Sequence, residues 1–279
     1  LQMGMVATDR IFGLLATSSN IEDKGTLSAK NLEGEIVFNK VHFSYVPDEE
    51  VLKGISFQIK KGETVAIVGA TGAGKSTIIN LLSRFYDFDK GDITIDGVSI
   101  KDFKLHTLRK EVAVVLQDVF LFADSLYNNI ILFDESISEE EVIRAAKEIG
   151  VHEFIESLPG KYHYDVKERG VLLSSGQRQL IAFLRAYITQ PNILILDEAT
   201  SSIDTYSEEL IQKATSILTK GKTSIIIAHR LATVKNADRI IVMDQGQIVE
   251  TGSHKELMKL LDGHYAKLYE IQFAAETPV

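Results

Sequence analysis

The sequence contains no cysteine. This absence excludes disulfide bonds, thiol catalysis and zinc sites built on thiolates, and it fits a reducing, cytoplasmic setting. No apolar run approaches the roughly 18 residues that a membrane-spanning helix needs. The N-terminal residues also lack the basic, apolar and small-residue regions of a signal peptide. The chain begins at Leu1 rather than Met, from which we expect a piece of a longer protein.

Basic residues are in the minority. The 30 Lys and Arg stand against 39 Asp and Glu, which gives a formal net charge of −9 and a pI near 5.3. Nucleic-acid-binding domains usually carry a basic face and a high pI, and the sequence has no block of Lys and Arg. We therefore expect no nucleic acid partner. Hydrophobic residues make up 45% of the 279 residues and charged residues 25%, as in an ordinary soluble globular protein.

Short runs rich in β-branched residues recur along the chain. Several are apolar throughout rather than alternating, which favours strands buried on both faces, as in a parallel sheet covered by helices. The stretch 123–188 differs, because it is rich in helical patterns and has no clear strand. We therefore predict an all-α insertion in an α/β core. The predicted strands are 35–39, 55–59, 64–68, 92–95, 113–116, 193–196, 224–228 and 239–243.

Two helices within the insertion have clear boundaries. Ser138 and Glu141 form a capping-box pattern that opens a helix ending near Gly150. A second helix is predicted to follow Ser174 and to run to about Ile188. Outside the insertion, residues 5–15 form a short amphipathic segment, and the polar residues 18–30 are predicted to be a linker.

A phosphate-binding loop is predicted at residues 69–76, Gly-Ala-Thr-Gly-Ala-Gly-Lys-Ser, which fit the pattern G-x-x-x-x-G-K-S. The loop follows an apolar strand and precedes a helix, which is the context that this motif requires. Its glycines let backbone N–H groups approach the phosphates, and the helix N-terminus adds partial positive charge. Lys75 is expected to reach the β- and γ-phosphates of ATP, and the Ser76 hydroxyl to ligate Mg²⁺.

Two carboxylates follow the predicted strand 193–196. Asp197 comes at the end of this strand and Glu198 directly after it. Acidic residues at the carboxyl end of a parallel strand point into the ligand crevice. Asp197 is therefore a candidate Mg²⁺ ligand, and Glu198 a candidate to orient or deprotonate the attacking water. By itself such a pair is usually the start of a polar loop.

Further residues resemble one family. Leu173-Ser-Ser-Gly-Gln177, at the start of the second predicted helix, resembles the LSGGQ signature of ABC (ATP-binding cassette) ATPases, 97 residues (173 − 76) after Ser76. Tyr45 resembles the aromatic residue that stacks on adenine. Gln117, Asp204 and His229 resemble the Q-loop glutamine, the D-loop aspartate and the switch histidine. These residues occur in the family's order, and the resemblance covers about residues 34–255. The chain is therefore identified as similar to an ABC nucleotide-binding domain.

The resemblance implies an α/β fold. It consists of a P-loop NTPase core with a mostly parallel sheet, an N-terminal antiparallel β subdomain and an all-α helical insertion. Residues 1–30 are then the tail of a membrane-domain segment and a linker, and 31–279 the ATPase domain. Within that domain we expect the nucleotide-binding core at 31–116 and 189–255, the helical subdomain at 117–188 and a C-terminal helix at 256–279.

The resemblance also assigns the site. Glu198, His229, Gln117 and Lys75 are the expected catalytic residues, and Ser76, Gln117 and Asp197 the expected Mg²⁺ ligands. The residues expected to contact ATP, in this chain or across a dimer, are Tyr45, Gly69, Thr71, Gly72, Ala73, Gly74, Lys75, Ser76, Thr77, Gln117, Ser174, Ser175, Gly176, Gln177 and Asp204. Taken without the other motifs, Tyr45 is more simply interpreted as a half-buried aromatic residue of a strand, and His229 as a core histidine.

In this family the signature closes on the ATP of a partner, so the resemblance implies a head-to-tail dimer with a second nucleotide-binding domain, identical or not. Ser175 replaces the first glycine of the signature and adds a Cβ that restricts φ. Residues 166–170, with Lys167 in place of a usual glycine, and residues 117–122 are similar to exporter loops. Phe120 and Phe122 form either a socket for a membrane-domain helix or part of the core.

The expected function is therefore that of the ATP-hydrolysing motor domain of an ABC exporter, at the cytoplasmic face of a membrane and coupled to a transmembrane domain. The alternative is a soluble, non-transport ABC ATPase. Chromosome-maintenance members place a long coiled coil before the signature, for which 97 residues (173 − 76) leave no room. Translation-associated members carry two cassettes. A P-loop kinase and a cassette that binds ATP without hydrolysing it are further alternatives, and Glu198 and His229 favour turnover.

Overall fold

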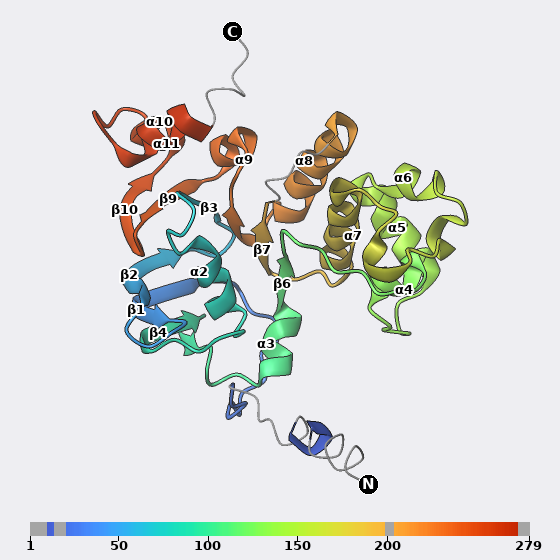
Figure 1. Cartoon of the computed structure of the whole chain (residues 1–279), viewed down its shortest axis with the longest axis horizontal. Coiled ribbons are helices and arrows are strands. Elements are labelled where there is room, and N and C mark those ends of the chain that lie inside the picture. Colours follow the sequence, from blue (N-terminus) through green and yellow to red (C-terminus); the bar gives the residue numbers. More distant parts are fainter. Residues whose placement is uncertain (1–9, 14–20, 199–203, 273–279) are drawn as a thin grey trace.

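The computed structural model describes residues 10–13, 21–198 and 204–272, which form two sheets with flanking helices (Figure 1). The larger sheet has the strand order β10-β9-β3-β8-β7-β6. Five of these strands are parallel, and β10 runs antiparallel beside β9. The bounds are β3 (Thr64–Gly69), β6 (Val112–Val115), β7 (Ile193–Asp197), β8 (Thr223–Ile227), β9 (Arg239–Asp244) and β10 (Gln247–Gly252).

The smaller sheet is antiparallel, with the order β2-β1-β4-β5. Phe38 of β1 stacks on Phe57 of β2, with ring centroids 4.5 Å apart. This sheet and helix α2 (Lys75–Leu82) share one hydrophobic core with the larger sheet, so they cover one of its faces. The bounds are β1 (Ile36–Ser44), β2 (Glu50–Ile59), β4 (Lys90–Ile95) and β5 (Val98–Ser99).

Strand alternation divides the parallel strands between two faces. Val65 and Ile67 of β3 and Ile195 of β7 pack into the core that contains α2. Their neighbours Ala66 and Leu194 point to the opposite face and belong to two other cores. Because both faces are covered, these strands are apolar throughout, as the sequence predicts. The opposite face is covered by α7 (Ser175–Ile188), α8 (Thr205–Thr219) and α9 (Leu231–Asn236).

The predicted helical insertion is confirmed as a group of helices beside the end of the sheet at β6 (Figure 1). Both predicted helix starts are confirmed, because Ser138 with Glu141 and Ser174 with Gln177 form complete capping boxes. The apolar faces of the helices meet in one core, to which α8 also contributes. The elements are α4 (Leu126–Ile131), α5 (Glu139–Ile149), α6 (His152–Glu156), the 3₁₀ turns η1 (Lys161–His163) and η2 (Glu168–Gly170), and α7.

All eight predicted strands are present, and β5 and β10 were not predicted. The single helix predicted over 256–279 is wrong in its described part, where α10 (His254–Leu257) and α11 (His264–Gln272) are separate. Between the two helices, Asp262 has a φ of 57°, which is not a helical conformation. Glu250 then accepts hydrogen bonds from the backbone N–H groups of His264 and Tyr265, at 2.6 and 2.9 Å, and so caps α11.

The predicted linker 18–30 is described from residue 21 onward and contacts the segment leading to α3 (Leu105–Glu111). The N–H groups of Thr26 and Leu27 both donate to the Asp102 carbonyl, at 3.0 Å. The buried Arg84, just after α2, donates to the Glu22 carbonyl at 3.3 Å. The first two bonds connect the linker to the segment before α3, and the third connects it to the end of the helix that follows the phosphate loop. The amphipathic segment 5–15 lies mostly outside the described residues.

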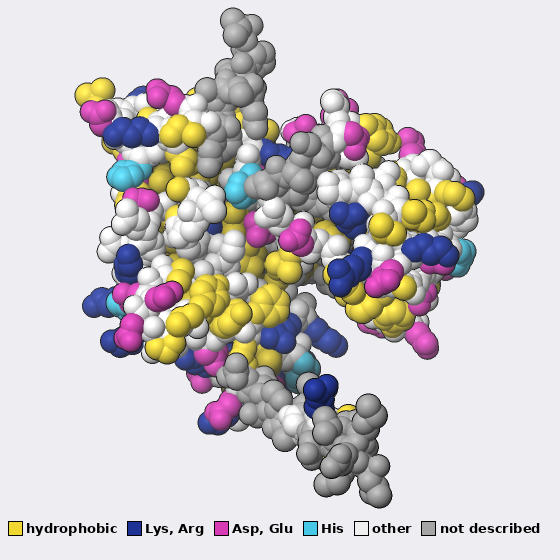
Figure 2. All heavy atoms as spheres, viewed as in Figure 1, with side chains coloured by type: hydrophobic (Ala, Val, Ile, Leu, Met, Phe, Trp, Pro, Cys, Tyr) yellow, Lys and Arg dark blue, Asp and Glu magenta, His cyan; other side chains and the backbone are white. Residues whose placement is uncertain are grey.

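The face of the molecule shown in Figure 2 is mixed in charge. On the face seen in Figure 2, Lys and Arg side chains are scattered among Asp and Glu side chains. In the described part of the chain, no helix has both the length and the apolar character needed to cross a membrane.

Candidate nucleotide site

The phosphate loop joins β3 to α2, as the motif predicts. Two of its glycines are required by the backbone. Gly74, the residue before α2, has φ 98°, a conformation that side chains disfavour. A Cβ at Gly69 would lie 2.3 Å from the Met243 carbonyl oxygen, so β9 approaches the loop too closely for any side chain. The loop therefore exposes backbone N–H groups at the N-terminus of α2, where an anion is favoured.

Lys75 is the first residue of α2, and its side chain reaches back into the loop. Its ammonium donates to the carbonyl oxygens of Gly69, at 2.7 Å, and Ala70, at 2.9 Å, and the residue is only 8% exposed. Burial lowers the pKa of Lys75, and the nearby Asp197 carboxylate opposes this shift. The ammonium is thus held inside the loop, in the region that phosphates would enter.

Tyr45 is tied to the phosphate-loop helix. Its hydroxyl lies 3.2 Å from the Thr77 hydroxyl and accepts a hydrogen bond from the Asn80 side chain at 2.9 Å. The ring meets Phe43 and Tyr86 edge-on and is 44% exposed. A partly exposed ring beside the loop has room for a base to stack on it, which is compatible with the predicted role in adenine binding.

Asp197 is the last residue of β7, and His229 follows the adjacent strand β8. Both side chains are close enough to Lys75 to be affected by its charge. Burial raises the pKa of Asp197 to about 6; Lys75 lowers it and Asp118 raises it. Burial and the Lys75 charge together lower the pKa of His229, which favours a neutral imidazole at pH 7. The structure therefore groups Asp197, His229 and Lys75, three of the predicted site residues.

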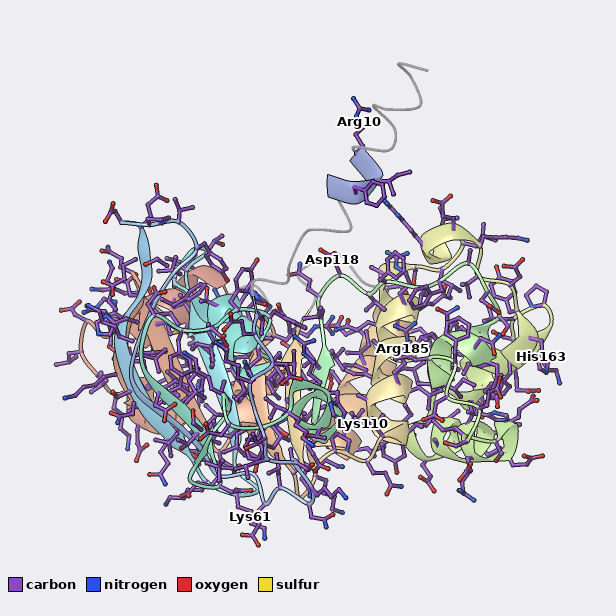
Figure 3. The ribbon with its side chains drawn as sticks, turned by 90° about the horizontal axis from the view of Figure 1, so that it is seen from below. Arg10, Lys61, Lys110, Asp118, His163 and Arg185 are labelled. Carbon is purple, nitrogen blue, oxygen red and sulfur yellow. The ribbon has the colours of Figure 1, made fainter. Side chains whose placement is uncertain are left out.

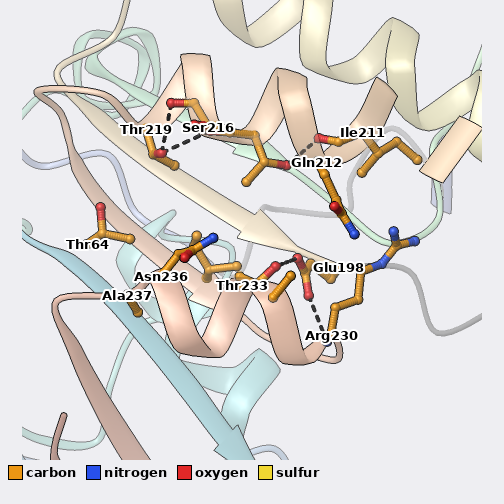
Figure 4. Close-up of a pocket in the computed structure, with 13 residues that line it drawn as sticks. Thr64, Glu198, Ile211, Gln212, Ser216, Thr219, Arg230, Thr233, Asn236 and Ala237 are labelled. Carbon is orange, nitrogen blue, oxygen red and sulfur yellow. Dashed lines mark hydrogen bonds between the residues drawn. The ribbon is translucent and has the colours of Figure 1, made fainter. Parts of the chain in front are cut away.

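Glu198 is oriented differently from Asp197. The residue is 4% exposed, and its carboxylate accepts hydrogen bonds from the backbone N–H groups of His229 at 2.9 Å and Arg230 at 3.2 Å. The Thr233 hydroxyl also donates to it (Figure 4). Burial raises the pKa of Glu198, although these hydrogen bonds oppose the shift. The predicted water-activating carboxylate therefore lies at the start of α9, on the α8–α9 side of the sheet.

Gln117 follows the edge strand β6 and is exposed. It begins the segment that crosses from the sheet to the helical insertion, on which Asp118 is visible in Figure 3. Arg185 of α7 holds this segment, because its guanidinium donates to the carbonyl oxygens of Phe120 at 2.9 Å and Asn129 at 2.6 Å. Burial lowers the pKa of Arg185 to about 10.

Phe120 and Phe122 are on the surface. They are 56% and 45% exposed, and their rings meet edge-on with centroids 5.2 Å apart. Phe133 packs against Phe122 at 5.8 Å and is itself 51% exposed. The interpretation of Phe120 and Phe122 as core residues of the insertion is therefore wrong, and the surface position leaves the socket interpretation open.

The signature segment forms the N-terminus of α7. The Ser174 hydroxyl accepts a hydrogen bond from the Gln177 N–H at 3.1 Å. Ser175 is the first residue of the helix, where a right-handed φ suits any side chain, so its Cβ adds no backbone strain. In Figures 1 and 3, α7 and α2 lie in different parts of the molecule, with β6 and β7 between them. The signature does not join the phosphate loop of its own chain.

Asp204 is the N-cap of α8, and its carboxylate accepts a hydrogen bond from the Ser207 N–H at 2.8 Å. This bond is the main cause of its lowered pKa. The cap gives Asp204 a structural role in this chain, and its predicted contact with ATP stays a prediction. Residues 199–203, which lead to it from Glu198, lie outside the described residues.

The motifs did not indicate two of the residues around the carboxylates. Asp118, next to Gln117, affects the pKa of Asp197. Thr233 holds Glu198 from a position 35 residues further along the chain. The one sequence feature that indicated different surroundings for the two carboxylates is strand alternation, which puts consecutive residues on opposite faces of a sheet. While the strand geometry continues, Asp197 and Glu198 cannot both point toward the loop.

Residues 52–201 match the ABC transporter family. The chain is 48% identical, over 98% of its length, to a probable multidrug resistance ABC transporter ATP-binding/permease protein of Bacillus subtilis. It is also 48% identical, over 97% of its length, to an ATP-dependent lipid A-core flippase of Pasteurella multocida. The chain spans 40% and 47% of these two relatives, less than half of each.

A solved structure, that of a bacterial Atm1-family ABC exporter with ATP bound, superposes on this fold with a TM-score of 0.88 and 39% sequence identity. The match covers 99% of this chain and 48% of the other. The chain therefore belongs to the ABC transporter family.

Proposed function

We propose that this chain powers an exporter by closing head to tail on a second nucleotide-binding domain over two molecules of ATP. The observation that carries the proposal is the separation of α2 and α7, two helices whose N-termini suit phosphate (Figure 1). Ser174 is exposed at the N-terminus of α7, away from the loop of its own chain. An anion site turned away from its own nucleotide supports action on the nucleotide of a partner.

In this proposal the loop glycines, with Thr71, Ala73 and Thr77, surround the phosphates while Lys75 offsets the charge that develops on them. Tyr45 stacks on adenine. Ser174, Gly176 and Gln177 act in trans, and the Ser175 N–H remains available at the start of the helix. Asp204 acts at the dimer contact.

The residues proposed to hold Mg²⁺ are Ser76, Gln117 and Asp197, which supply the oxygen donors that this hard cation prefers. Burial raises the pKa of Asp197 to about 6, and a cation bound beside this carboxylate would favour its ionised form. Bound there, Mg²⁺ neutralises charge on the β- and γ-phosphates. His229, kept neutral by burial and by Lys75, is proposed to donate to the γ-phosphate.

Glu198 is proposed as the general base for the attacking water. Its buried position beside α9 implies that the side chain must turn toward the nucleotide before hydrolysis. We propose that closure of the dimer accompanies this change, since the reaction then takes place between two chains.

The chain covers less than half of the length of these two relatives. Any further domain of the transporter is therefore proposed by analogy with the relatives. A transmembrane domain, fused or on a partner chain, would contact the exposed aromatic cluster of Phe120, Phe122 and Phe133 at the cytoplasmic face of the membrane. Arg185 of the signature helix α7 donates a hydrogen bond to the Phe120 carbonyl. A movement of the cluster would therefore also move α7.

The test is the molar mass of Glu198→Gln in solution, measured by light scattering with and without Mg-ATP. The 31.0 kDa chain is expected to double in mass when Mg-ATP is present. The double variant Lys75→Ala/Glu198→Gln is the matched control and is expected to stay monomeric. A persistent monomer despite measured ATP binding would contradict self-pairing.

A mixing experiment tests action in trans. Lys75→Ala has a damaged phosphate loop, and Ser174→Arg has a damaged signature. Neither homodimer therefore has a complete site. In a mixed dimer, the phosphate loop of one chain meets the signature of the other and forms one complete site. Phosphate release by the mixture is expected to exceed that of either variant alone. Equal rates would argue that the signature serves its own chain.

A further inference from the structure

The Glu198 carboxylate occupies a defined position on the side of the sheet opposite α2. Its backbone N–H donates to the Ile227 carbonyl at 3.2 Å, so the strand pairing of β7 with β8 continues through this residue. Alternation therefore turns Asp197 toward the face of Lys75 and Glu198 toward α8 and α9. The direction of the Glu198 side chain follows from the strand geometry and from the hydrogen-bond donors that contact its carboxylate.

The donors belong to one short segment. One carboxylate oxygen accepts from the N–H groups of His229 and Arg230, at 2.9 and 3.2 Å, and the other accepts from the Thr233 hydroxyl. Two of them are backbone groups that any sequence would supply. Thr233 is the side chain that completes the set, and its hydroxyl contributes directly to the orientation of Glu198 (Figure 4).

Glu198 also borders a cavity of about 360 Å³ between α8 and α9 (Figure 4). Arg230 lies on its wall and pairs with Glu208 at 3.2 Å. Arg230 is thus engaged through its backbone by Glu198 and through its guanidinium by Glu208 on α8. This arrangement holds the start of α9 against α8, with Glu198 between the cavity and the sheet.

We propose that Thr233 is a positioning residue that stores the Glu198 carboxylate on the α8–α9 side of the sheet, and that turnover requires Glu198 to leave this position. The inference rests on the proposed role of Glu198 in hydrolysis. A hydrogen bond made only in the stored position stabilises that position relative to the one facing the nucleotide. Its removal therefore shifts the population toward the reactive position.

Thr233→Val keeps the β-branched shape and removes the hydroxyl. Because a hydrogen bond to a carboxylate is stronger than an ordinary one, kcat for ATP is expected to rise about fivefold. KM is expected to stay unchanged, since Thr233 lies on the α8–α9 side of the sheet, opposite α2 and the phosphate loop. Thr233→Ser restores the hydroxyl and is expected to restore the wild-type kcat. A kcat for Thr233→Val at or below that of wild type would overturn the proposal.

Thr215→Val is the matched control. Thr215 lines the same cavity, but its hydroxyl donates to the Ile211 carbonyl at 2.8 Å within α8. An equal rise in kcat for Thr215→Val would assign the effect to the cavity instead of Thr233 and overturn the proposal. In a Glu198→Gln background, Thr233→Val is expected to give no gain. If Lys75→Ala hydrolyses as fast as wild type, the proposed function itself fails, which is a distinct outcome.

Hydrogen exchange of the amides that donate to Glu198 reports directly on whether its carboxylate is in the stored position, and the measurement does not depend on turnover. In Thr233→Val without nucleotide, the amides of His229 and Arg230 are expected to exchange faster than in wild type. The Val234 amide, which donates to the Arg230 carbonyl at 3.2 Å, reports whether α9 is intact and is expected not to change. Unchanged exchange at His229 and Arg230 would overturn the proposal.

If Thr233→Val does not fold, the same amides are followed in the wild-type chain with and without Mg²⁺ and a non-hydrolysable ATP analogue. Release of Glu198 predicts faster exchange at His229 and Arg230 when the analogue drives dimer formation. Equal or slower exchange in the dimer would overturn the proposal.

Discussion

Asp197 and Glu198 are consecutive in the chain, yet their carboxylates lie on opposite sides of the parallel sheet. Asp197 is within the electrostatic reach of Lys75, whereas Glu198 accepts hydrogen bonds from the first residues of α9. Two adjacent carboxylates in such different surroundings suit two different tasks. One lies beside the phosphate loop in the resting molecule, and the other is held back from it.

This relationship predicts opposite phenotypes for two isosteric substitutions. Asp197→Asn is expected to weaken Mg-ATP binding about tenfold, because a charged ligand to the cation is lost, with little change in binding without Mg²⁺. Glu198→Gln is expected to leave affinity within about twofold and to lower kcat at least about 100-fold. Calorimetry with and without EDTA, together with phosphate release, measures both. A Glu198→Gln variant that keeps most of its rate would assign water activation to another group.

Tyr45 gives a prediction about the base. Tyr45→Leu is expected to weaken ATP binding about tenfold, since stacking on an aromatic ring is worth about 1–3 kcal/mol per base. Binding of inorganic triphosphate, which has no base to stack, is expected not to change. Tyr45→Phe is the control: it keeps the ring and removes the hydroxyl that Thr77 and Asn80 contact. Equal losses for ATP and triphosphate would mean that Tyr45 acts by shaping the loop.

The pair of Glu63 and Arg239 predicts a pH dependence of stability. Glu63 lies just before β3, and its carboxylate accepts from the Arg239 guanidinium of β9 at 2.7 Å. Burial raises the pKa of Glu63, but hydrogen bonds from Arg239 and the Lys60 backbone outweigh it and hold the pKa below the ordinary value near 4.5. A lowered pKa means that this stabilisation is complete above pH 4.5 and is lost as the pH falls through the folded-state value.

Glu63→Gln is therefore expected to lower the free energy of unfolding at pH 7 by about 0.5–1 kcal/mol, a value reduced for solvent screening. The deficit is expected to shrink as the pH is lowered below 4.5. Because the chain has no tryptophan, urea unfolding is followed by circular dichroism. Glu33→Gln, which removes an exposed pair with Lys61, is expected to change stability by less than about 0.3 kcal/mol. A deficit that persists at low pH would contradict the ionic origin.

Local patterns were sufficient for the phosphate loop and for the capped helices. The loop needs only a strand, a run of glycines and a helix start, and these are adjacent in sequence. The caps of α5 and α7 are likewise decided within four residues, Ser138 to Glu141 and Ser174 to Gln177. The parallel strands were found because strands covered on both faces are apolar throughout.

The features that escaped prediction depend on contacts between distant residues. The orientation of Glu198 is decided by Thr233, on another element. The break between α10 and α11 depends on Glu250 of β10, which caps α11 from outside. Strand β10 is partly exposed and pairs at the edge of the sheet, so it lacks the apolar run that marks the buried strands. The predicted domain boundaries and site roles stay predictions.

Lys167 provides the last prediction, at the position where the family resemblance implies a glycine. Its φ of 59° and ψ of −176° lie in a region that is almost exclusive to glycine. Such a conformation costs about 1–3 kcal/mol. Glycine costs about 0.5–1 kcal/mol in chain entropy, and the exposed ion pair with Asp165 is worth at most about 1 kcal/mol. We therefore expect Lys167→Gly to raise the free energy of unfolding by about 0.5 kcal/mol, measured by urea titration. Lys167→Ala keeps the Cβ and loses the same ion pair, so it is expected to be less stable than Lys167→Gly. Equal stability of the two variants would contradict this prediction, because the strain relieved by glycine would then be no larger than its chain-entropy cost of about 0.5–1 kcal/mol.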